Sequence, residues 1–155
     1  MEKILIVLII FAFLIGTTGG QITLRDLKPE NIEIVKNKIT GNQNIQEEKS
    51  GNNDLYKVYK KDISGNASIN LTSDRGNIYL LFEGKITGNI NINVKSKRGN
   101  VHIKFAEAIL GNPNIILEAP RGTVVFYNDV NTIGNAKISV NSLNVKYRSG
   151  NPIRY

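Results

Sequence analysis

The sequence of 155 residues predicts an all-β protein, a short parallel β-solenoid (β-helix) of about five coils of 23 residues each. A Gly-Asn pair recurs every 23 residues, and an Arg-Gly pair recurs with the same period between the Gly-Asn pairs. Between these landmarks apolar and polar residues alternate, which is typical of strands. The Gly-Asn pairs are Gly65-Asn66, Gly88-Asn89, Gly111-Asn112 and Gly134-Asn135, and the Arg-Gly pairs begin at Arg75, Arg98 and Arg121.

The repeat is clearest in two consecutive blocks that align without a gap, ISGNASINLTSDRGNIYLLF at 63–82 and ITGNININVKSKRGNVHIKF at 86–105. The block at 109–128 keeps both landmarks, and the block at 132–147 has lost its Arg-Gly pair. A degenerate block at 39–59 precedes them all. Each unit is expected to contain a strand, a turn at the Arg-Gly pair, a second strand and a corner at the Gly-Asn pair. No stretch after Lys36 is expected to be helical.

A second architecture, an antiparallel β-sandwich or meander with hairpin turns at the Arg-Gly pairs, also fits a strand-turn-strand unit. The constant period favours the solenoid, because every coil needs the same circumference. The Gly-Asn corner favours it too, since Gly allows a positive φ and stacked Asn side chains can form a ladder. The Arg-Gly pairs favour the alternative, because guanidinium groups in adjacent coils would lie about 5 Å apart and repel one another.

The N-terminal segment predicts export. One Lys, an uncharged apolar run and a stretch of small residues give residues 1–20 the pattern of a signal peptide, and an uncleaved membrane anchor is the alternative. Residues 21–36 are then a cap or linker, in which Ile32, Ile34 and Leu27 are expected to supply a strand or a short amphipathic turn. Residues 37–147 form the solenoid and 148–155 a C-terminal tail. The protein is therefore expected to be extracellular or on the cell surface, with membrane contact only through residues 1–20.

Composition narrows the class of partner. The formal net charge is +7, and removal of Glu2 and Lys3 with residues 1–20 leaves it unchanged. An exported protein does not meet intracellular nucleic acid, so anionic surface polymers or glycans are the expected partners of this positive charge. The absence of Cys excludes disulfides, thiol chemistry and Cys metal sites. The candidate anion-binding residues are Arg75, Arg98 and Arg121, flanked by Lys95 and Lys97, and the alternative is that Arg is merely tolerated in the turn.

The I-x-G-N-I-x-I and R-G-N-V-x-I units behind an export signal resemble the adhesin β-solenoid domains of bacterial and archaeal surface proteins, of the head-GIN autotransporter-adhesin type. The resemblance covers about residues 63–147. It implies a parallel β-helical fold at a cell surface and brings no catalytic or binding residue with it. The chain departs from that pattern in its short length and in having Asn where such repeats more often have Asp, which argues against calcium in the turns.

Catalysis, cofactors and metals are not expected. Enzymes of the β-helix class that act on polysaccharides need clustered carboxylates. Here the acidic residues of the repeat fall at different phases of the period, so we expect them on different faces. His102 alternates with apolar neighbours and is expected on the outer side of its strand. Phosphate-binding and calcium-binding glycine motifs are absent. The acidic residues are Asp74, Glu83, Glu107, Glu118 and Asp129.

Two further expectations concern the surface and the ends. Asn66 and Asn70 each begin an N-glycosylation sequon. The open strand edges at the ends of a solenoid must be capped or paired, so we expect capped monomers, with end-to-end filaments as the alternative. The sequence therefore favours a non-enzymatic, exported, adhesin-like module. A self-assembling envelope subunit is the alternative, and a polysaccharide-acting enzyme a remote one.

Overall fold

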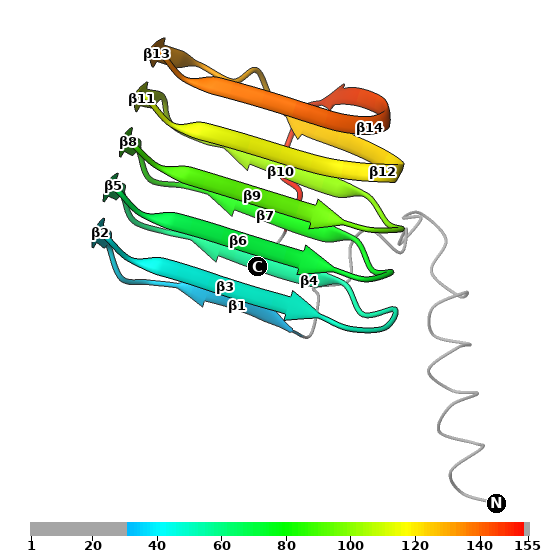
Figure 1. Cartoon of the computed structure of the whole chain (residues 1–155). Coiled ribbons are helices and arrows are strands. Elements are labelled where there is room, and N and C mark those ends of the chain that lie inside the picture. The colour runs from blue at the N-terminus through cyan, green and yellow to red at the C-terminus, as the bar shows by residue number, and fades with distance from the viewer. Residues whose placement is uncertain (1–30, 154–155) are drawn as a thin grey trace, which may run out of the picture.

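The computed structural model describes residues 31–153, and all regular elements in this part of the chain are β-strands (Figure 1). Residues 1–20, expected to be a signal peptide or anchor, lie outside the described residues. Within residues 31–153 no helix is long and apolar enough to cross a bilayer. The strands are β1 (Ile32–Val35), β2 (Ile39–Gly41), β3 (Asn44–Lys49), β4 (Leu55–Tyr59), β5 (Ile63–Gly65), β6 (Ser68–Ser73), β7 (Ile78–Phe82), β8 (Ile86–Gly88), β9 (Asn91–Ser96), β10 (Val101–Phe105), β11 (Ile109–Gly111), β12 (Asn114–Tyr127), β13 (Thr132–Gly134) and β14 (Lys137–Arg148).

Every strand pairs in parallel with the equivalent strand of a neighbouring coil, which confirms the solenoid and rules out the antiparallel alternative. The first strands of the coils form a front sheet of β3, β6, β9 and the beginnings of β12 and β14. The second strands form a back sheet of β1, β4, β7, β10 and the ends of β12 and β14. The short strands β2, β5, β8, β11 and β13 form a corner sheet.

The register gives the length of a coil directly. Ser68 lies beside Asn91, and Asn91 beside Asn114, so residues 23 apart occupy the same position in successive coils. We call such a set of equivalent residues a column. In the expected cap segment, β1 pairs in parallel with β4 and is therefore the first strand of the back sheet.

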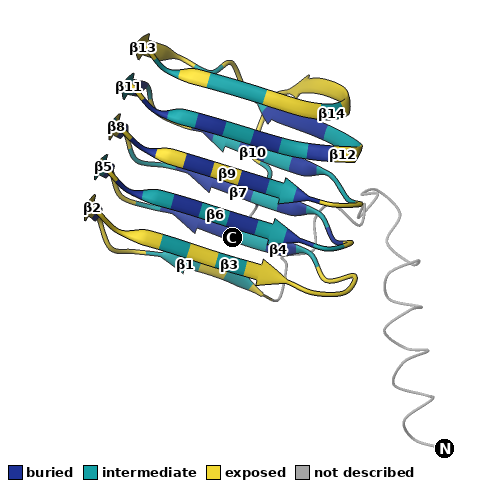
Figure 2. Cartoon of the chain, in the orientation of Figure 1, coloured by how far each residue is buried: buried dark blue, intermediate teal, exposed yellow. Residues whose placement is uncertain are grey.

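The core is the space between the front and back sheets, where columns of apolar residues stack along the axis (Figure 2). Each fully buried Leu, Ile or Phe contributes roughly 1.5–3 kcal/mol, and repetition of the unit adds a similar layer with each coil. Aromatic rings also stack in one column, with centroids 4.8 Å apart for Tyr59 and Phe82 and 5.1 Å apart for Phe82 and Phe105. The front-sheet columns are Ile69-Ile92-Ile115 and Leu71-Val94-Leu117, and the back-sheet columns include Ile78-Val101-Val124 and Leu80-Ile103-Phe126.

The first coil places charges in these core columns. Glu47 occupies the column of Leu71, and Lys57 the column of Leu80. Lys57 is 4% exposed, and its Nζ forms ion pairs with Glu47 Oε2 and, at 3.0 Å, with Glu33 Oε1. A buried ammonium is tolerated only with such partners. The N-terminal end of the solenoid is thus closed by an ion-pair cluster of Glu33, Glu47 and Lys57, which we call the charged cap.

The Gly-Asn corners are built as the sequence predicts. The corner glycines have positive φ angles, from +75° at Gly41 to +110° at Gly88. The Asn side chains form the predicted ladder: Asn89 Nδ2 donates to Asn66 Oδ1 and Asn112 Nδ2 donates to Asn89 Oδ1, both at 3.3 Å. Glycine is required for a second reason, because a Cβ on Gly88 would lie 2.5 Å from the carbonyl oxygen of Gly65 in the coil below.

The glycines of the Arg-Gly turns are needed for close approach alone. A Cβ on Gly99 would lie 2.4 Å from the carbonyl oxygen of Gly76, yet neither residue has a positive φ. A second amide ladder follows the turn, in which Asn100 donates from both N and Nδ2 to Asn77 Oδ1, at 2.9 and 3.0 Å. The Oδ1 of Asn100 in turn accepts the backbone N–H of Thr123 at 2.8 Å.

The third Arg-Gly pair does not separate two strands, contrary to the expected unit. β12 runs through Arg121-Gly122 and pairs with β14 on both sides of a register irregularity between Ala119 and Thr123. The reason is that β14 lacks the Arg-Gly pair: Ala119 pairs with Ser142 and Thr123 with Asn144, so β14 makes the same bend with fewer residues.

The C-terminal tail folds back along the outer face of the back sheet, which the sequence did not indicate. Ile153 is 2% exposed and packs against Val58 and Leu81. Lys104 Nζ donates to the Gly150 carbonyl oxygen at 2.9 Å and to Asn151 Oδ1 at 2.7 Å. The tail therefore runs away from the last coil toward the middle of the molecule (Figure 1).

Two matched substitutions test the close stacking of the corners. Gly41 and Gly88 both have positive φ, but a Cβ on Gly41 would meet no atom within 4 Å. We expect Gly41→Ala to lower the free energy of unfolding by about 1–2 kcal/mol, the cost of a left-handed backbone. Gly88→Ala adds a backbone clash, so its loss should be at least about 3 kcal/mol. Chemical denaturation measures both, and equal losses would contradict the stacking.

Candidate functional site: the arginine edge and the lysine hollow

The predicted arginines occupy one edge of the solenoid, at the turn between the front and back sheets. Each precedes a glycine that stacks on the glycine of the next coil, so Arg75, Arg98 and Arg121 stand in one column, which we call the arginine edge. All three are exposed. Arg75 Nε lies 3.8 Å from Asp74 Oδ2, while Arg98 and Arg121 have no ion pair within residues 31–153. The backbones of adjacent coils lie roughly 5 Å apart along the axis, so the three arginine side chains begin at that spacing.

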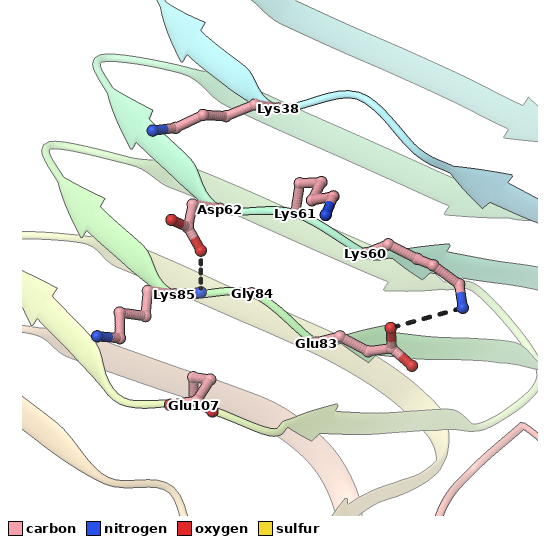
Figure 3. A pocket seen from close by; sticks show the side chains of 8 residues that line it. All are labelled: Lys38, Lys60, Lys61, Asp62, Glu83, Gly84, Lys85 and Glu107. Carbon is pink, nitrogen blue, oxygen red and sulfur yellow. Dashed lines mark hydrogen bonds and ion pairs between the residues drawn. The ribbon is translucent and has the colours of Figure 1, made fainter.

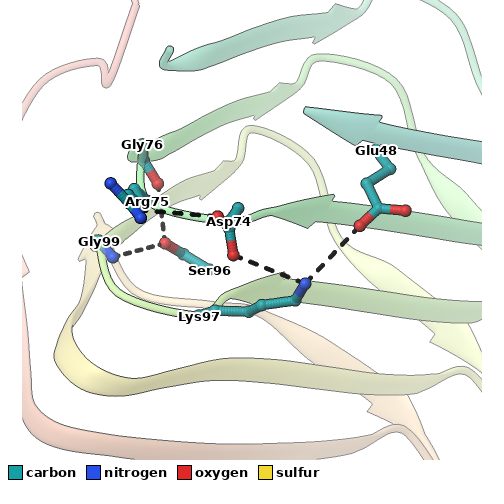
Figure 4. A network of polar contacts seen from close by, with 7 residues as sticks. All are labelled: Glu48, Asp74, Arg75, Gly76, Ser96, Lys97 and Gly99. Carbon is teal, nitrogen blue, oxygen red and sulfur yellow. Dashed lines mark hydrogen bonds and ion pairs between the residues drawn. The ribbon is translucent and has the colours of Figure 1, made fainter. Parts of the chain in front are cut away.

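The two flanking lysines are paired with carboxylates. Lys95 Nζ lies 2.6 Å from Glu118 Oε2 on the outer face of the front sheet. Lys97 Nζ lies between Glu48 and Asp74, 3.7 Å from each (Figure 4). Such exposed pairs are each worth at most about 1 kcal/mol. The uncompensated charge of the edge is therefore concentrated on Arg98 and Arg121.

Ser96 fixes the turn that carries these arginines. Its Oγ donates to the Gly76 carbonyl oxygen at 2.8 Å and accepts the Gly99 N–H at 2.9 Å, which ties two successive turns together (Figure 4). Sequence reasoning did not assign this role. The available signal was the serine of the recurring S-x-R-G pattern, which also places Ser73 in the column below.

A hollow of about 540 Å³ lies beside the strands of the corner sheet and was not predicted (Figure 3). Four lysines line it, and two of them, Lys38 and Lys85, share a column with Asp62 between them. Gly84 lies between Lys61 and Glu107 in the repeat and leaves room there, because it has no side chain. Three carboxylates among the lining residues balance most of the charge of the four lysines, and Lys60 Nζ lies 3.8 Å from Glu83 Oε2. Asp62 Oδ1 also accepts the backbone N–H of Lys85 at 3.0 Å. The lining residues are Lys38, Lys60, Lys61, Asp62, Glu83, Gly84, Lys85 and Glu107.

The hollow corrects one expectation about the acidic residues. Glu83 and Glu107 were expected on different faces, but both line it. Glu107 follows Glu83 by 24 residues, one more than the period, and the turn between the back strand and the corner brings both carboxylates to the same side. By contrast, Asp74 lies at the arginine edge and Glu118 on the front sheet. Within residues 31–153 no three acidic or His side chains gather as a metal site.

His102 lies on the outer side of its strand, as expected, but within a column of stacked aromatic rings. Its ring centroid is 4.5 Å from that of Tyr79, and the Tyr127 hydroxyl lies 3.4 Å from His102 Nδ1. Tyr79 in turn stacks on Tyr56 at 4.7 Å. Burial, and secondarily the positive charge of Arg148, lower the pKa of His102 to about 4. The imidazole is therefore neutral at physiological pH and serves as a packing element.

The two sequon asparagines have engaged side chains. Asn66 Nδ2 donates to Asn42 Oδ1 at 3.3 Å as part of the corner ladder. Asn70 Nδ2 donates to Ser68 Oγ at 3.1 Å on the front sheet. A glycan linked at either Nδ2 would replace a donor of these contacts.

Comparison with known proteins adds no identity to this geometry: no family model, no characterised protein and no solved structure matches the chain.

The pKa of His102 predicts a pH-dependent stability. The unfolded chain binds more protons between pH 6.5, the ordinary pKa, and about 4, so stability falls as pH is lowered through this range. His102→Phe should keep the ring stack and remove this titration. We expect the loss of unfolding free energy between pH 7 and pH 4.5 to be smaller in the variant by about 1–2 kcal/mol, allowing for partial exposure. Denaturation at both pH values measures it, and equal losses would contradict the assignment.

Proposed function

We propose that the protein is a non-enzymatic, exported surface module, adhesin-like in type, which binds anionic envelope polymers or glycans along its arginine edge. The observation that carries the proposal is the column of Arg75, Arg98 and Arg121 at stacked turns. A rigid row of guanidinium groups suits a polymer that repeats its negative charge, because each group can donate two hydrogen bonds to a carboxylate, sulfate or phosphate.

The surrounding charges support a reversible contact. Lys95 and Lys97 have carboxylate partners, so an incoming polyanion meets Arg98 and Arg121 first. The weak exposed pairs of Lys97 can exchange their partners for ligand oxygens at little cost. The formal net charge of +7 adds long-range attraction that salt will screen.

The lysine hollow offers a matched control for this proposal. The variant R75Q/R98Q/R121Q and the variant K38Q/K61Q/K85Q remove the same charge from opposite edges of the solenoid. With heparin as the probe, we expect the arginine variant to bind about 10–100-fold more weakly, since each lost charge-assisted contact costs on the order of 0.5–1 kcal/mol. The lysine variant should lose only the smaller contribution that long-range attraction by the net charge makes to the binding free energy.

Binding is measured by titration at two salt concentrations, with thermal unfolding to verify the fold of each variant. Equal losses in the two variants would show that net charge, not the arginine edge, attracts the polymer. Unchanged binding in the arginine variant would refute the proposal.

A further inference from the structure

The two ends of the solenoid differ in chemistry. Among the described residues, the exposed large hydrophobic side chains all belong to the last coil. Tyr147 is 67% exposed, Val145 45% and Val140 37%. The remaining two are Ile133 and Leu143. The first coil instead ends in the charged cap.

Three of the exposed side chains are core residues without a covering coil. Val140 continues the column of Leu117, Val145 that of Val124, and Tyr147 that of Phe126. Tyr147 stacks on Phe126 with the ring centroids 5.6 Å apart. They are exposed because, within residues 31–153, β14 pairs only with β12. Its other edge, 12 residues long, has no strand paired to it in the described part of the chain (Figures 1 and 2). The tail does not cover it, since Ile153 packs far down the back sheet.

The charged cap shows which end of a second copy could cover this surface. The same core columns that end in Val140 and Tyr147 begin with Glu47, and with Lys57 beside Glu33. Lys57 is already buried, but the side chain of Glu33 is 55% exposed and that of Glu47 22%. Head-to-tail stacking would press apolar side chains onto these two carboxylates and remove them from water, which costs several kcal/mol for a buried ion. The C-terminal end of a second copy, by contrast, presents matching apolar columns.

We infer that the C-terminal end is a self-association surface, through which two copies stack with β14 pairing against β14 of the second copy. A two-fold axis perpendicular to the solenoid makes these edge strands antiparallel and satisfies their open backbone groups. The core columns then continue from one copy into the other. Because both outer ends of the dimer are charged caps, growth stops at two copies.

The charges of the last coil predict how salt acts on this contact. Lys137, Lys146 and Arg148 occupy outward positions of β14 and stay in water when the cores join. No acidic residue follows Asp129 in the sequence, so like charges face each other across the dimer. Added salt screens this repulsion, and the dimer should become tighter as ionic strength rises.

The test places a Glu and a Lys, as in the charged cap, at the C-terminal end of the solenoid. In the variant V140E/Y147K, the new side chains occupy the columns of Glu47 and Lys57, where an ion pair already forms in the first coil. The control S139E/N141K introduces the same two residue types at outward positions of the same strand. Sedimentation velocity and light scattering give the mass of each purified protein between about 1 and 100 μM, the range of moderate affinities.

We expect dimers for the parent and the control, and weakening of association by about 100-fold or more in V140E/Y147K. Circular dichroism and the denaturation midpoint verify that the variant is folded. A Kd that falls between 50 and 500 mM NaCl supports the like-charge contact. A monomeric parent, filaments, a dimer that survives V140E/Y147K, or a dimer that salt dissociates would each overturn the inference.

Discussion

The structure depends on in-register backbone pairing between coils of nearly constant length, 23 residues in the middle of the solenoid and 24 in the first coil. Parallel strands of successive coils lie close to 4.8 Å apart, and the chain must turn at the same place in each coil to keep that spacing. The corner and turn glycines make this possible, since a Cβ at Gly88 or Gly99 would clash with a backbone oxygen of the adjacent coil at 2.5 or 2.4 Å. Once the backbone is in register, apolar columns, aromatic stacks and amide ladders follow, because like residues lie above like.

A repeating stack has no intrinsic end, so residues that depart from the repeat decide whether another coil can stack on each end. At the first coil, Lys57 with Glu33 and Glu47 makes the core unsuitable for further apolar stacking. At the last coil the same columns remain apolar and exposed. The sides differ as well: one edge presents arginines one coil apart, while the hollow opposite balances lysines with carboxylates. The repeat sets the spacing of these groups, and departures from the repeat decide what each surface can contact.

The sequence predicts the features that repeat and misses those that occur once. The period gives the parallel fold, the corner glycines and the Asn66-Asn89-Asn112 ladder, because each residue recurs at a fixed interval. It does not give the burial of Ile153, the charged cap or the hollow at Gly84, since these depend on single side chains meeting across the coil. The pairing of Lys97 with Glu48 and Asp74 is of the same kind, because its partners come from two other coils.

The most direct test of the account is a measurement of proton-proton contacts between strands by nuclear magnetic resonance. The parallel solenoid predicts contacts between backbone protons of residues 23 apart, such as Gly65 with Gly88 and Gly88 with Gly111. An antiparallel arrangement would instead give contacts between β6 and β7 across the Arg75-Gly76 turn, with none at the interval of 23. Observation of the second pattern would contradict the account.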